Sequence, residues 1–247
     1  MTVLLVHGVP ETAALWDPLE AALGRDDVEA LSLPGFSCPR SDGFCATKEE
    51  YVDWLVGELE FRQDRRPIDL VGHDWGGGFV VRVVSTRPDL VRSWVTDAAG
   101  VGDADFEWHE FAKIWQTPGA GEEFFEQQLN ASTEERAAIF ELSGVPHDRA
   151  MVLAAGVDRT MTECILPLYR SAVEVGKEWG PDFADVPAPG LVLVPTEDPF
   201  LVAESARAGA ARAGAQVREL EGVGHWWMLQ EPDRGAEVLR EFWATLD

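Results

Sequence analysis

The chain has 247 residues, of which 46% are hydrophobic and 26% are charged, a composition that allows one large buried core without disulfides or metals. Its 20 lysines and arginines stand against 44 aspartates and glutamates, and the net charge of -24 repels nucleic-acid phosphates and anionic lipid headgroups. The composition thus excludes wholesale disorder and disfavours nucleic acid and membrane partners.

Short apolar segments alternate with helix-length segments along most of the chain. The short segments predict buried strands at residues 2–6, 28–33, 68–71, 93–96, 191–194 and 216–220. The longer segments have apolar residues at helical spacing and predict helices at residues 49–63, 78–86, 202–213 and 233–246. Strands and helices in alternation are typical of a mostly parallel sheet, so the sequence predicts an α/β fold.

The alternation stops after the fourth predicted strand. Residues 101–186 contain no convincing strand, and their apolar residues sit at helical spacing around glycine, proline and acidic positions. We therefore predict a core made of residues 1–100 and 187–247, with a helical cap of residues 101–186 inserted into it.

The cysteines and the first residues of the chain indicate in which cellular compartment the protein works. Cys38, Cys45 and Cys164 are odd in number and lack the close paired spacing of zinc or redox motifs, which predicts ordinary reduced thiols. Met1 leads directly into the first predicted strand without an apolar signal segment, which predicts a cytoplasmic location. We expect no metal and no organic cofactor.

Asp74 occupies the strongest local motif. The segment Gly72-His73-Asp74-Trp75-Gly76 follows a predicted strand and precedes a predicted helix. This is the pattern of a nucleophile elbow, in which a sharp turn lifts the central residue above the sheet and glycines let the backbone approach closely. The alternative is a glycine-rich turn that binds phosphate and whose aspartate caps the helix. Against it, the complete glycine patterns of phosphate-binding loops are missing.

Two further candidate residues follow the last two predicted strands. Asp198 and His225 should therefore lie at the carboxyl edge of the sheet, where open α/β sheets bind ligands. The chain order Asp74, Asp198, His225 is the nucleophile, acid, histidine order of a hydrolase triad. Glu197 is the alternative acid, and His225 is alternatively a surface-loop residue packed against the neighbouring tryptophans.

These residues predict a two-step hydrolysis. Asp74 would attack an electrophilic carbon to form an ester, and water activated by His225 would then hydrolyse that ester. Asp198 would orient the imidazole and stabilise its charged form. The backbone N–H groups of Val9 and Trp75 are placed by sequence to stabilise the oxyanion, so we predict an oxyanion hole there.

Four segments carry a family resemblance, in this order along the chain: His7-Gly8-Val9-Pro10, Leu33-Pro34-Gly35-Phe36, His73-Asp74-Trp75-Gly76 and Gly224-His225. With them the chain resembles, over nearly its whole length, the α/β-hydrolase branch that contains epoxide hydrolases and haloalkane dehalogenases. Serine esterases of that fold carry Ser at the Asp74 position. The resemblance therefore implies a carboxylate nucleophile and an alkyl-enzyme ester.

The resemblance also implies that the cap supplies groups that hydrogen-bond an epoxide oxygen and donate a proton as the ring opens. Leu168-Tyr169-Arg170 resembles the second of two tyrosine positions in epoxide hydrolases. The first tyrosine is not evident, and His109, which follows Trp108 in the early cap segment, is the candidate for its role. The alternative for Tyr169 is a residue of an amphipathic helix whose hydroxyl faces water, and the alternatives for His109 are packing beside Trp108 or exposure to solvent.

The chain departs from that family at its first strand. This strand begins at residue 2, where the family has two earlier strands, so we expect a smaller sheet with an edge that a second copy could cover in a homodimer. Val9 replaces an aromatic residue common at that position, which we expect to open the pocket.

The sequence thus predicts an epoxide hydrolase that converts a small apolar electrophile to a vicinal diol. A haloalkane dehalogenase is the nearest alternative, because the Trp75 indole N–H could bind a leaving halide. Against it, Val9 stands where many dehalogenases carry a second donor, Asn, and haloacetate dehalogenases have arginine where Trp75 stands. Other α/β-hydrolase chemistry and a non-catalytic small-molecule binding protein are further alternatives, and the complete series of three triad residues argues against the binding protein.

Overall fold

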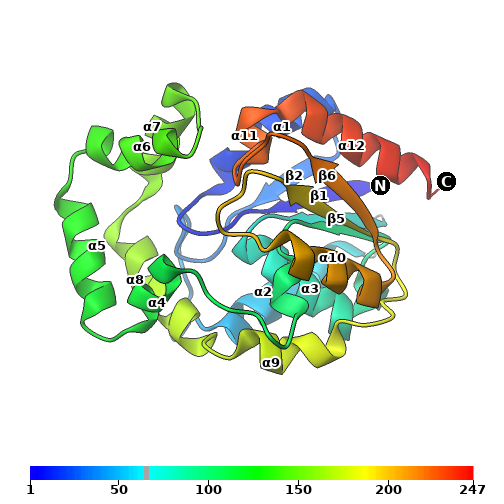
Figure 1. The fold of residues 1–247 in the computed structure, drawn as a ribbon, viewed down its shortest axis with the longest axis horizontal. Coiled ribbons are helices and arrows are strands. Elements are labelled where there is room, and N and C mark those ends of the chain that lie inside the picture. Colours follow the sequence, from blue (N-terminus) through cyan, green and yellow to red (C-terminus); the bar gives the residue numbers. More distant parts are fainter. Residues whose placement is uncertain (64–66, 247) are drawn as a thin grey trace.

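Six parallel strands form one sheet in the part of the chain that the structure, a computed structural model, describes: residues 1–63 and 67–246 (Figure 1). Residues 64–66 and 247 of the predicted core lie outside the described part. The strand order is β2-β1-β3-β4-β5-β6, and every pairing is parallel, which confirms the predicted α/β fold. The strands are β1 (Thr2–Val6), β2 (Val28–Leu31), β3 (Ile68–Gly72), β4 (Ser93–Thr96), β5 (Gly190–Pro195) and β6 (Gln216–Leu220).

Strand β2 ends two residues earlier than predicted. The expected strand reached Leu33, but the Leu33 backbone N–H donates to Nε2 of His7 at 3.2 Å and not to a neighbouring strand. Nδ1 of the same buried ring lies 2.9 Å from the Gly8 carbonyl oxygen. The His7 imidazole thus joins the loop after β1 to the loop after β2, and it shapes the edge of the sheet on which the site lies.

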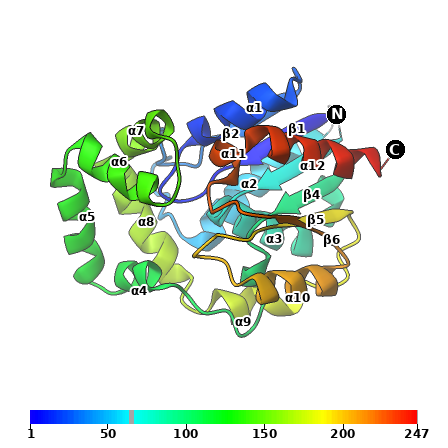
Figure 2. The same cartoon turned by 45° about the horizontal axis from the view of Figure 1, so that its top comes forward.

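Helices cover both faces of the sheet (Figure 1, Figure 2). One face carries α2 (Lys48–Gln63), α3 (Trp75–Thr86) and α10 (Ala203–Ala213), and the other carries α1 (Asp17–Leu23), α11 (Trp227–Gln230) and α12 (Pro232–Ala244). Short 3-10 helices lie at Ala13–Trp16 (η1), Pro88–Leu90 (η2), Ala99–Gly102 (η3) and Gly180–Asp182 (η4). Each face has its own buried apolar cluster, so both sides of the sheet are packed.

Helix α3 begins at Trp75, three residues before the predicted start at Gly78. Consecutive glycines weaken an isolated helix, and Gly76, Gly77 and Gly78 all lie in its first turn. Packing explains the early start: a Cβ on Gly76 would overlap the Val6 carbonyl oxygen, and one on Gly77 would lie 2.6 Å from Thr96 Oγ1. The glycines therefore let the first turn of α3 sit directly against the ends of β1 and β4.

The segment between β4 and β5 is helical, without a strand in its described residues. It contains α4 (Glu110–Gln116), α5 (Ala120–Asn130), α6 (Thr133–Leu142), α7 (His147–Gly156), α8 (Arg159–Ser171) and α9 (Val175–Trp179). Helices α4 to α8 project beyond the carboxyl edge of the sheet, whereas α9 packs on η3 and η4 beneath the core (Figure 2). The division into a core and a cap domain stays a prediction.

Among the described residues, no helix is both long and apolar enough to cross a membrane.

Candidate active site

Asp74 sits on a sharp turn between β3 and α3, at φ 50° and ψ -121°. A positive φ is strained for a residue that has a side chain, and it persists only where the surroundings hold it. A Cβ on Gly72 would overlap the Gly76 carbonyl group, so the turn closes this tightly only with glycine. The turn has the geometry of a nucleophile elbow and presents Asp74 at the carboxyl edge of the sheet.

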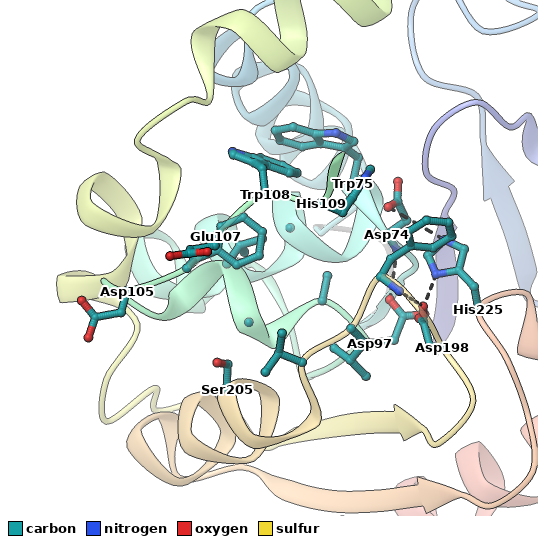
Figure 3. A pocket seen from close by; sticks show the side chains of 18 residues that line it. Asp74, Trp75, Asp97, Asp105, Glu107, Trp108, His109, Asp198, Ser205 and His225 are labelled. Carbon is teal, nitrogen blue, oxygen red and sulfur yellow. Dashed lines mark hydrogen bonds and ion pairs between the residues drawn. The ribbon is translucent and has the colours of Figure 1, made fainter. Parts of the chain in front are cut away.

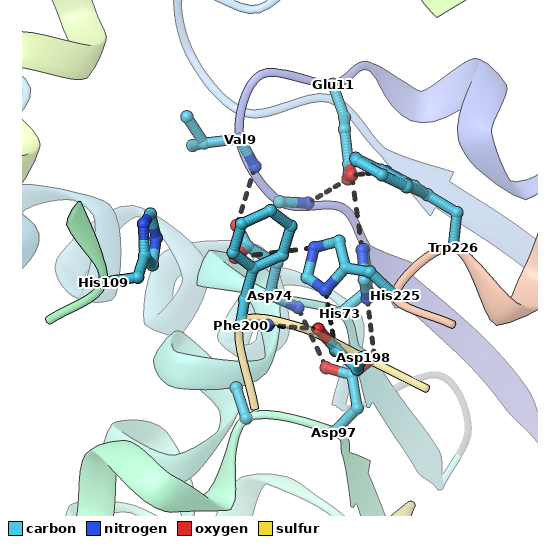
Figure 4. Close-up of polar contacts among 12 residues, drawn as sticks. Val9, Glu11, His73, Asp74, Asp97, His109, Asp198, Phe200, His225 and Trp226 are labelled. Atoms are coloured by element: carbon cyan, nitrogen blue, oxygen red, sulfur yellow. Dashed lines mark hydrogen bonds and ion pairs between the residues drawn. The ribbon is translucent and has the colours of Figure 1, made fainter. Parts of the chain in front are cut away.

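The two oxygens of the Asp74 carboxylate have different surroundings (Figure 4). Oδ1 accepts a hydrogen bond from the Val9 backbone N–H at 2.9 Å, and the Trp75 backbone N–H also bonds to the carboxylate. Oδ2 lies 3.9 Å from Nε2 of His225, which is too long for a hydrogen bond. The residues predicted to form the oxyanion hole, Val9 and Trp75, thus both contact the carboxylate, and Oδ2 faces the imidazole.

His225 is paired with the predicted acid. Nδ1 of His225 and Oδ2 of Asp198 lie 2.8 Å apart, and Oδ1 of Asp198 accepts from the Phe200 backbone N–H at 2.8 Å. A neutral His225 that donates from Nδ1 leaves its Nε2 lone pair on the side of Asp74. Glu197, the alternative acid, is exposed, and His225 is buried, unlike a surface-loop residue.

Burial and the neighbouring charges together set the pKa values of these groups. Burial raises the pKa of Asp74 to about 6, against the attraction of the His225 imidazole. Burial alone would lower the pKa of His225, but the Asp198 carboxylate outweighs it and the pKa lies above its ordinary value of 6.5. For Asp198, burial favours the neutral acid, yet the attraction of His225 holds the pKa below its ordinary value. Both carboxylates are therefore ionised at neutral pH, as a nucleophile and an orienting acid require.

A second cluster of charged side chains lies beside the triad (Figure 4). Nδ1 of His73 is 2.6 Å from Oδ2 of Asp97, and Nε2 of His73 is 3.3 Å from Oε1 of Glu11. All three side chains are buried. Oδ1 of Asp97 accepts a hydrogen bond from the Asp74 backbone N–H at 2.9 Å, so the cluster also anchors the elbow.

Glu11, His73 and Asp97 are site residues that were not predicted from the sequence. A signal was available, because each lies just beyond the carboxyl end of a strand, at the edge where the site was expected. Glu11, His73 and His225 offer ligand atoms within 4.8 Å of one another, a group that could hold a metal ion. Each ring nitrogen of His73 already faces a carboxylate, however, so ion pairing accounts for the cluster.

Two cavities meet at the Asp74 carboxylate. The first, of about 300 Å³, runs between the triad and α10, with the Trp75 and Trp108 rings on one side (Figure 3). The second, of about 360 Å³, lies under the cap and is mostly apolar, with side chains that include Phe111, Trp115, Phe124, Phe125, Phe140 and Leu142. Four side chains line both cavities: Asp74, His109, Phe200 and His225. A substrate in either cavity therefore reaches both Asp74 and His225.

The two predicted cap residues line the larger cavity together with Asp74. His109 is the N-cap of α4, and its Nδ1 accepts from the Ala112 backbone N–H at 3.2 Å. Burial lowers the pKa of His109 to about 4, so at neutral pH the ring is neutral and carries its proton on Nε2. Burial and the Asp74 carboxylate raise the pKa of Tyr169 well above its ordinary value, so its hydroxyl stays protonated. Both side chains can thus donate a hydrogen bond in the cavity that contains the Asp74 carboxylate.

A parallel α/β sheet with a histidine between two carboxylates at its carboxyl edge is typical of hydrolases. Residues 3–238 match the alpha/beta hydrolase family, and the chain belongs to that family.

Two sequence relatives match the chain. The chain is 22% identical over 256 residues to (E)-2-((N-methylformamido)methylene)succinate hydrolase of Acinetobacter baylyi, covering 98% of this chain and 90% of that protein. It is 31% identical over 121 residues to a haloalkane dehalogenase of Psychrobacter cryohalolentis, covering 46% of this chain and 39% of that protein.

Among solved structures, an epoxide hydrolase from Vigna radiata superposes with a TM-score of 0.77 at 18% identity, covering 99% of this chain and 91% of that one. At this identity the likeness shows the fold alone.

Proposed function

We propose that this hydrolase opens epoxides and that Asp74 is its nucleophile. The observation that carries the proposal is the unequal setting of the two Asp74 oxygens: the Val9 N–H holds Oδ1 at 2.9 Å, while Oδ2 faces His225 Nε2 at 3.9 Å. An ester formed through Oδ2 leaves Oδ1 beside the Val9 backbone N–H, where negative charge develops when water attacks Cγ. The carboxylate is therefore arranged for both formation and hydrolysis of an ester.

In the first step, Oδ2 of Asp74 attacks one carbon of the epoxide and the carbon–oxygen bond of the ring breaks. The departing oxygen takes a proton from Tyr169, with His109 as a second hydrogen-bond donor. Both residues line the same cavity as Asp74, which supports this assignment. The product of this step is a hydroxyalkyl ester on the enzyme.

In the second step, Nε2 of His225 takes a proton from water as the water oxygen attacks Cγ of Asp74. The bond between Cγ and the substrate oxygen then breaks, and that oxygen takes the proton held by His225, so the vicinal diol leaves. The carboxylic acid formed at Asp74 loses its proton and returns to the carboxylate, and this proton restores the Tyr169 hydroxyl that was consumed in the first step. Asp198, at 2.8 Å from Nδ1, stabilises the imidazolium that forms.

The larger cavity is suited to a small apolar substrate, because aromatic and aliphatic side chains supply most of its lining. The cytoplasmic location stays a prediction.

Replacing Tyr169 by Phe is expected to lower kcat for epoxide opening by about 10²-fold, because the departing oxygen loses its proton donor. The measurement is chromatographic detection of diol from a pool of epoxides. Tyr51→Phe is the matched control: this tyrosine is also buried, but its hydroxyl donates to the Pro34 carbonyl oxygen at 2.8 Å, in the core. Wild-type turnover by Tyr169→Phe would contradict the role given to this hydroxyl.

A specific observation favours haloalkane dehalogenation as the second candidate. The indole N–H groups of Trp75 and Trp115 are among the buried side-chain donors in the described part that have no hydrogen-bond partner. Trp75 lines the first cavity and Trp115 the second, and a departing halide ion could accept from such donors.

Incubation with separate pools of epoxides and haloalkanes distinguishes the two activities, because one releases diol and the other releases halide ion. Diol formation that is lost in Asp74→Ala supports the proposal, and halide release without diol overturns it in favour of the second candidate. Ligand binding without turnover of either pool would instead favour a non-catalytic binding protein.

A further inference from the structure

The helices between β4 and β5 pack in two separate groups. Helices α4, α5 and α8 share a buried apolar cluster with α2 and α3, whereas α6 and α7 share one with α1, α11 and α12. In Figure 1, α6 and α7 accordingly stand on the α11 side of the cap. The larger cavity is lined by both groups, with Trp115 and Tyr169 from one and Phe140 from the other. We call α6, α7 and the turn between them, residues 133–156, the α6–α7 wall.

The α6–α7 wall also forms part of the mouth of this cavity. Ile139 and Leu142 on α6 line the cavity, as does Phe111 on α4, and all three are large hydrophobic residues exposed to solvent. Leu142 is 89% exposed. Side chains that face both the cavity and the solvent lie where the cavity opens. The position of the wall therefore sets one side of the opening through which a substrate passes.

One side chain connects this wall to the turn that carries the catalytic base. Gln230 is the last residue of α11, and its Nε2 donates to the Ser143 carbonyl oxygen of the wall at 2.9 Å. Its Oε1 accepts from the Gly224 backbone N–H at 2.7 Å, and Gly224 directly precedes His225. The carboxamide supplies one donor and one acceptor, as these two partners require. A carboxylate would turn an oxygen toward the Ser143 carbonyl, and a hydrocarbon would satisfy neither partner.

Glycine stands at both ends of this connection. A Cβ on Gly144, which lies at φ 84°, would be 2.9 Å from Nε2 of Gln230, and a Cβ on Gly224 would be 3.2 Å from the same atom. The carboxamide therefore fits between two backbone turns that approach it closely. Ring packing reinforces the connection, because the Phe140 ring of the wall meets the Trp226 ring edge to face at a centroid distance of 5.3 Å.

The position of His225 matters for only one of the two proposed half-reactions. Attack by the Asp74 carboxylate on the substrate uses no proton transfer to His225. Hydrolysis of the ester requires Nε2 of His225 within hydrogen-bond reach of a water molecule that also reaches Cγ of Asp74. Asp198 holds the opposite side of the ring at Nδ1, so the backbone of the turn must place Nε2. A displaced turn therefore slows hydrolysis and leaves ester formation intact.

We propose that Gln230 is a positioning residue that holds the His225 turn against the α6–α7 wall. The wall that bounds the substrate cavity thereby also aligns the base for ester hydrolysis. The inference rests on the roles proposed above for Asp74 and His225. Gln230 lines neither of the two cavities, so it acts through the Gly224 backbone and the wall without touching the substrate.

Replacing Gln230 by Met keeps the length of the side chain and removes both hydrogen bonds. Ester hydrolysis should slow by about tenfold, because a base displaced by a fraction of an ångström loses its alignment with the water. The rate of ester formation should stay unchanged. Rapid quenching and intact-protein mass spectrometry with pooled epoxides should therefore show more ester in Gln230→Met than in the unmodified protein. A merely structural defect would lower both half-reactions by the same factor and would collect no extra ester.

A second variant, Gln230→Glu, tests the contact with the wall alone. At pH 8 the glutamate is ionised, so it still accepts from the Gly224 N–H but turns its other oxygen toward the Ser143 carbonyl. Ester hydrolysis should again slow, and this variant takes the place of Gln230→Met if that one does not fold. The matched control is Gln127→Met, which changes an exposed glutamine on α5 and should leave both rates unchanged.

The His225→Gln variant in the same experiment separates failure of the inference from failure of the proposed function. If His225→Gln collects ester while Gln230→Met hydrolyses it at the unmodified rate, or loses both half-reactions equally, the inference is overturned and the function stands. An unmodified rate of hydrolysis in Gln230→Glu overturns the role of the wall. If His225→Gln collects no ester, the proposed function fails.

Amide hydrogen exchange then decides the inference without a substrate. Exchange is followed by mass spectrometry in the wall, residues 137–146, and in the His225 turn, residues 221–227. Faster exchange in both segments of Gln230→Met, and in neither segment of Gln127→Met, is the expected result, because the wall and the turn lose their shared contact. Unchanged exchange in the His225 turn of Gln230→Met overturns the inference.

Discussion

Replacing His225 by Gln is expected to stop the enzyme after its first half-reaction and leave the substrate on Asp74 as an ester. Attack by the Asp74 carboxylate needs no base, whereas hydrolysis of the ester needs His225 to take a proton from water. We therefore expect hydrolysis to slow by about 10²–10⁴-fold while ester formation continues. Intact-protein mass spectrometry after exposure to pooled epoxides should show a gain equal to one whole epoxide molecule.

The matched control is Asp74→Ala in the His225→Gln background. It removes the attacking oxygens and should abolish the adduct, while the partner acid Asp198 stays in place. An adduct that survives in this double variant would show that another residue is alkylated, and it would remove Asp74 from the mechanism. A gain equal to an alkyl halide less HX, seen with pooled haloalkanes, would instead establish dehalogenation.

The positions of the triad residues could be predicted because each depends on a local rule. Asp74 is marked by glycines that a tight turn requires, Asp198 follows the plainly apolar strand β5, and His225 follows the last predicted strand, β6. Parallel strands bring their carboxyl ends to one edge, so three residues distant in sequence fall into one site. The observed 2.8 Å contact between His225 and Asp198 agrees with that expectation.

The deeper cluster could not be predicted in the same way, because its pairing is tertiary. Glu11, His73 and Asp97 lie on three different loops, and nothing local indicates that one imidazole meets two buried carboxylates. The errors in the predicted elements have the same origin. Leu33 was expected in a strand, but the distant His7 ring binds its N–H, and α3 starts at Trp75 because its glycines fit against the ends of β1 and β4.

Replacing Asp97 by Ala is expected to lower the free energy of unfolding by about 3–5 kcal/mol, the cost of removing one partner from a buried ion pair. Three groups lose their acceptor at once: the His73 imidazolium, the Asp74 backbone N–H and the Trp227 indole N–H. The free energy of unfolding is measured by urea denaturation at pH 7, with circular dichroism as the signal. Asp42→Ala, a change at an exposed acid, is the control and should alter it by less than about 0.5 kcal/mol.

The loss in free energy of unfolding caused by Asp97→Ala should be the same at pH 5 and at pH 7. The pKa of Asp97 in the folded protein is below its ordinary value of 3.8, because the attraction of His73 outweighs burial. A lowered pKa makes a stabilising contribution that is fully present above the unfolded value and is lost only as pH falls below it. The pKa of His73 is well above 6.5, so its contribution is present below the unfolded value and is lost only as pH rises through the folded value. Both charges are therefore in place from pH 5 to pH 7, and a loss of stability that disappears at pH 5 would contradict the assigned charges.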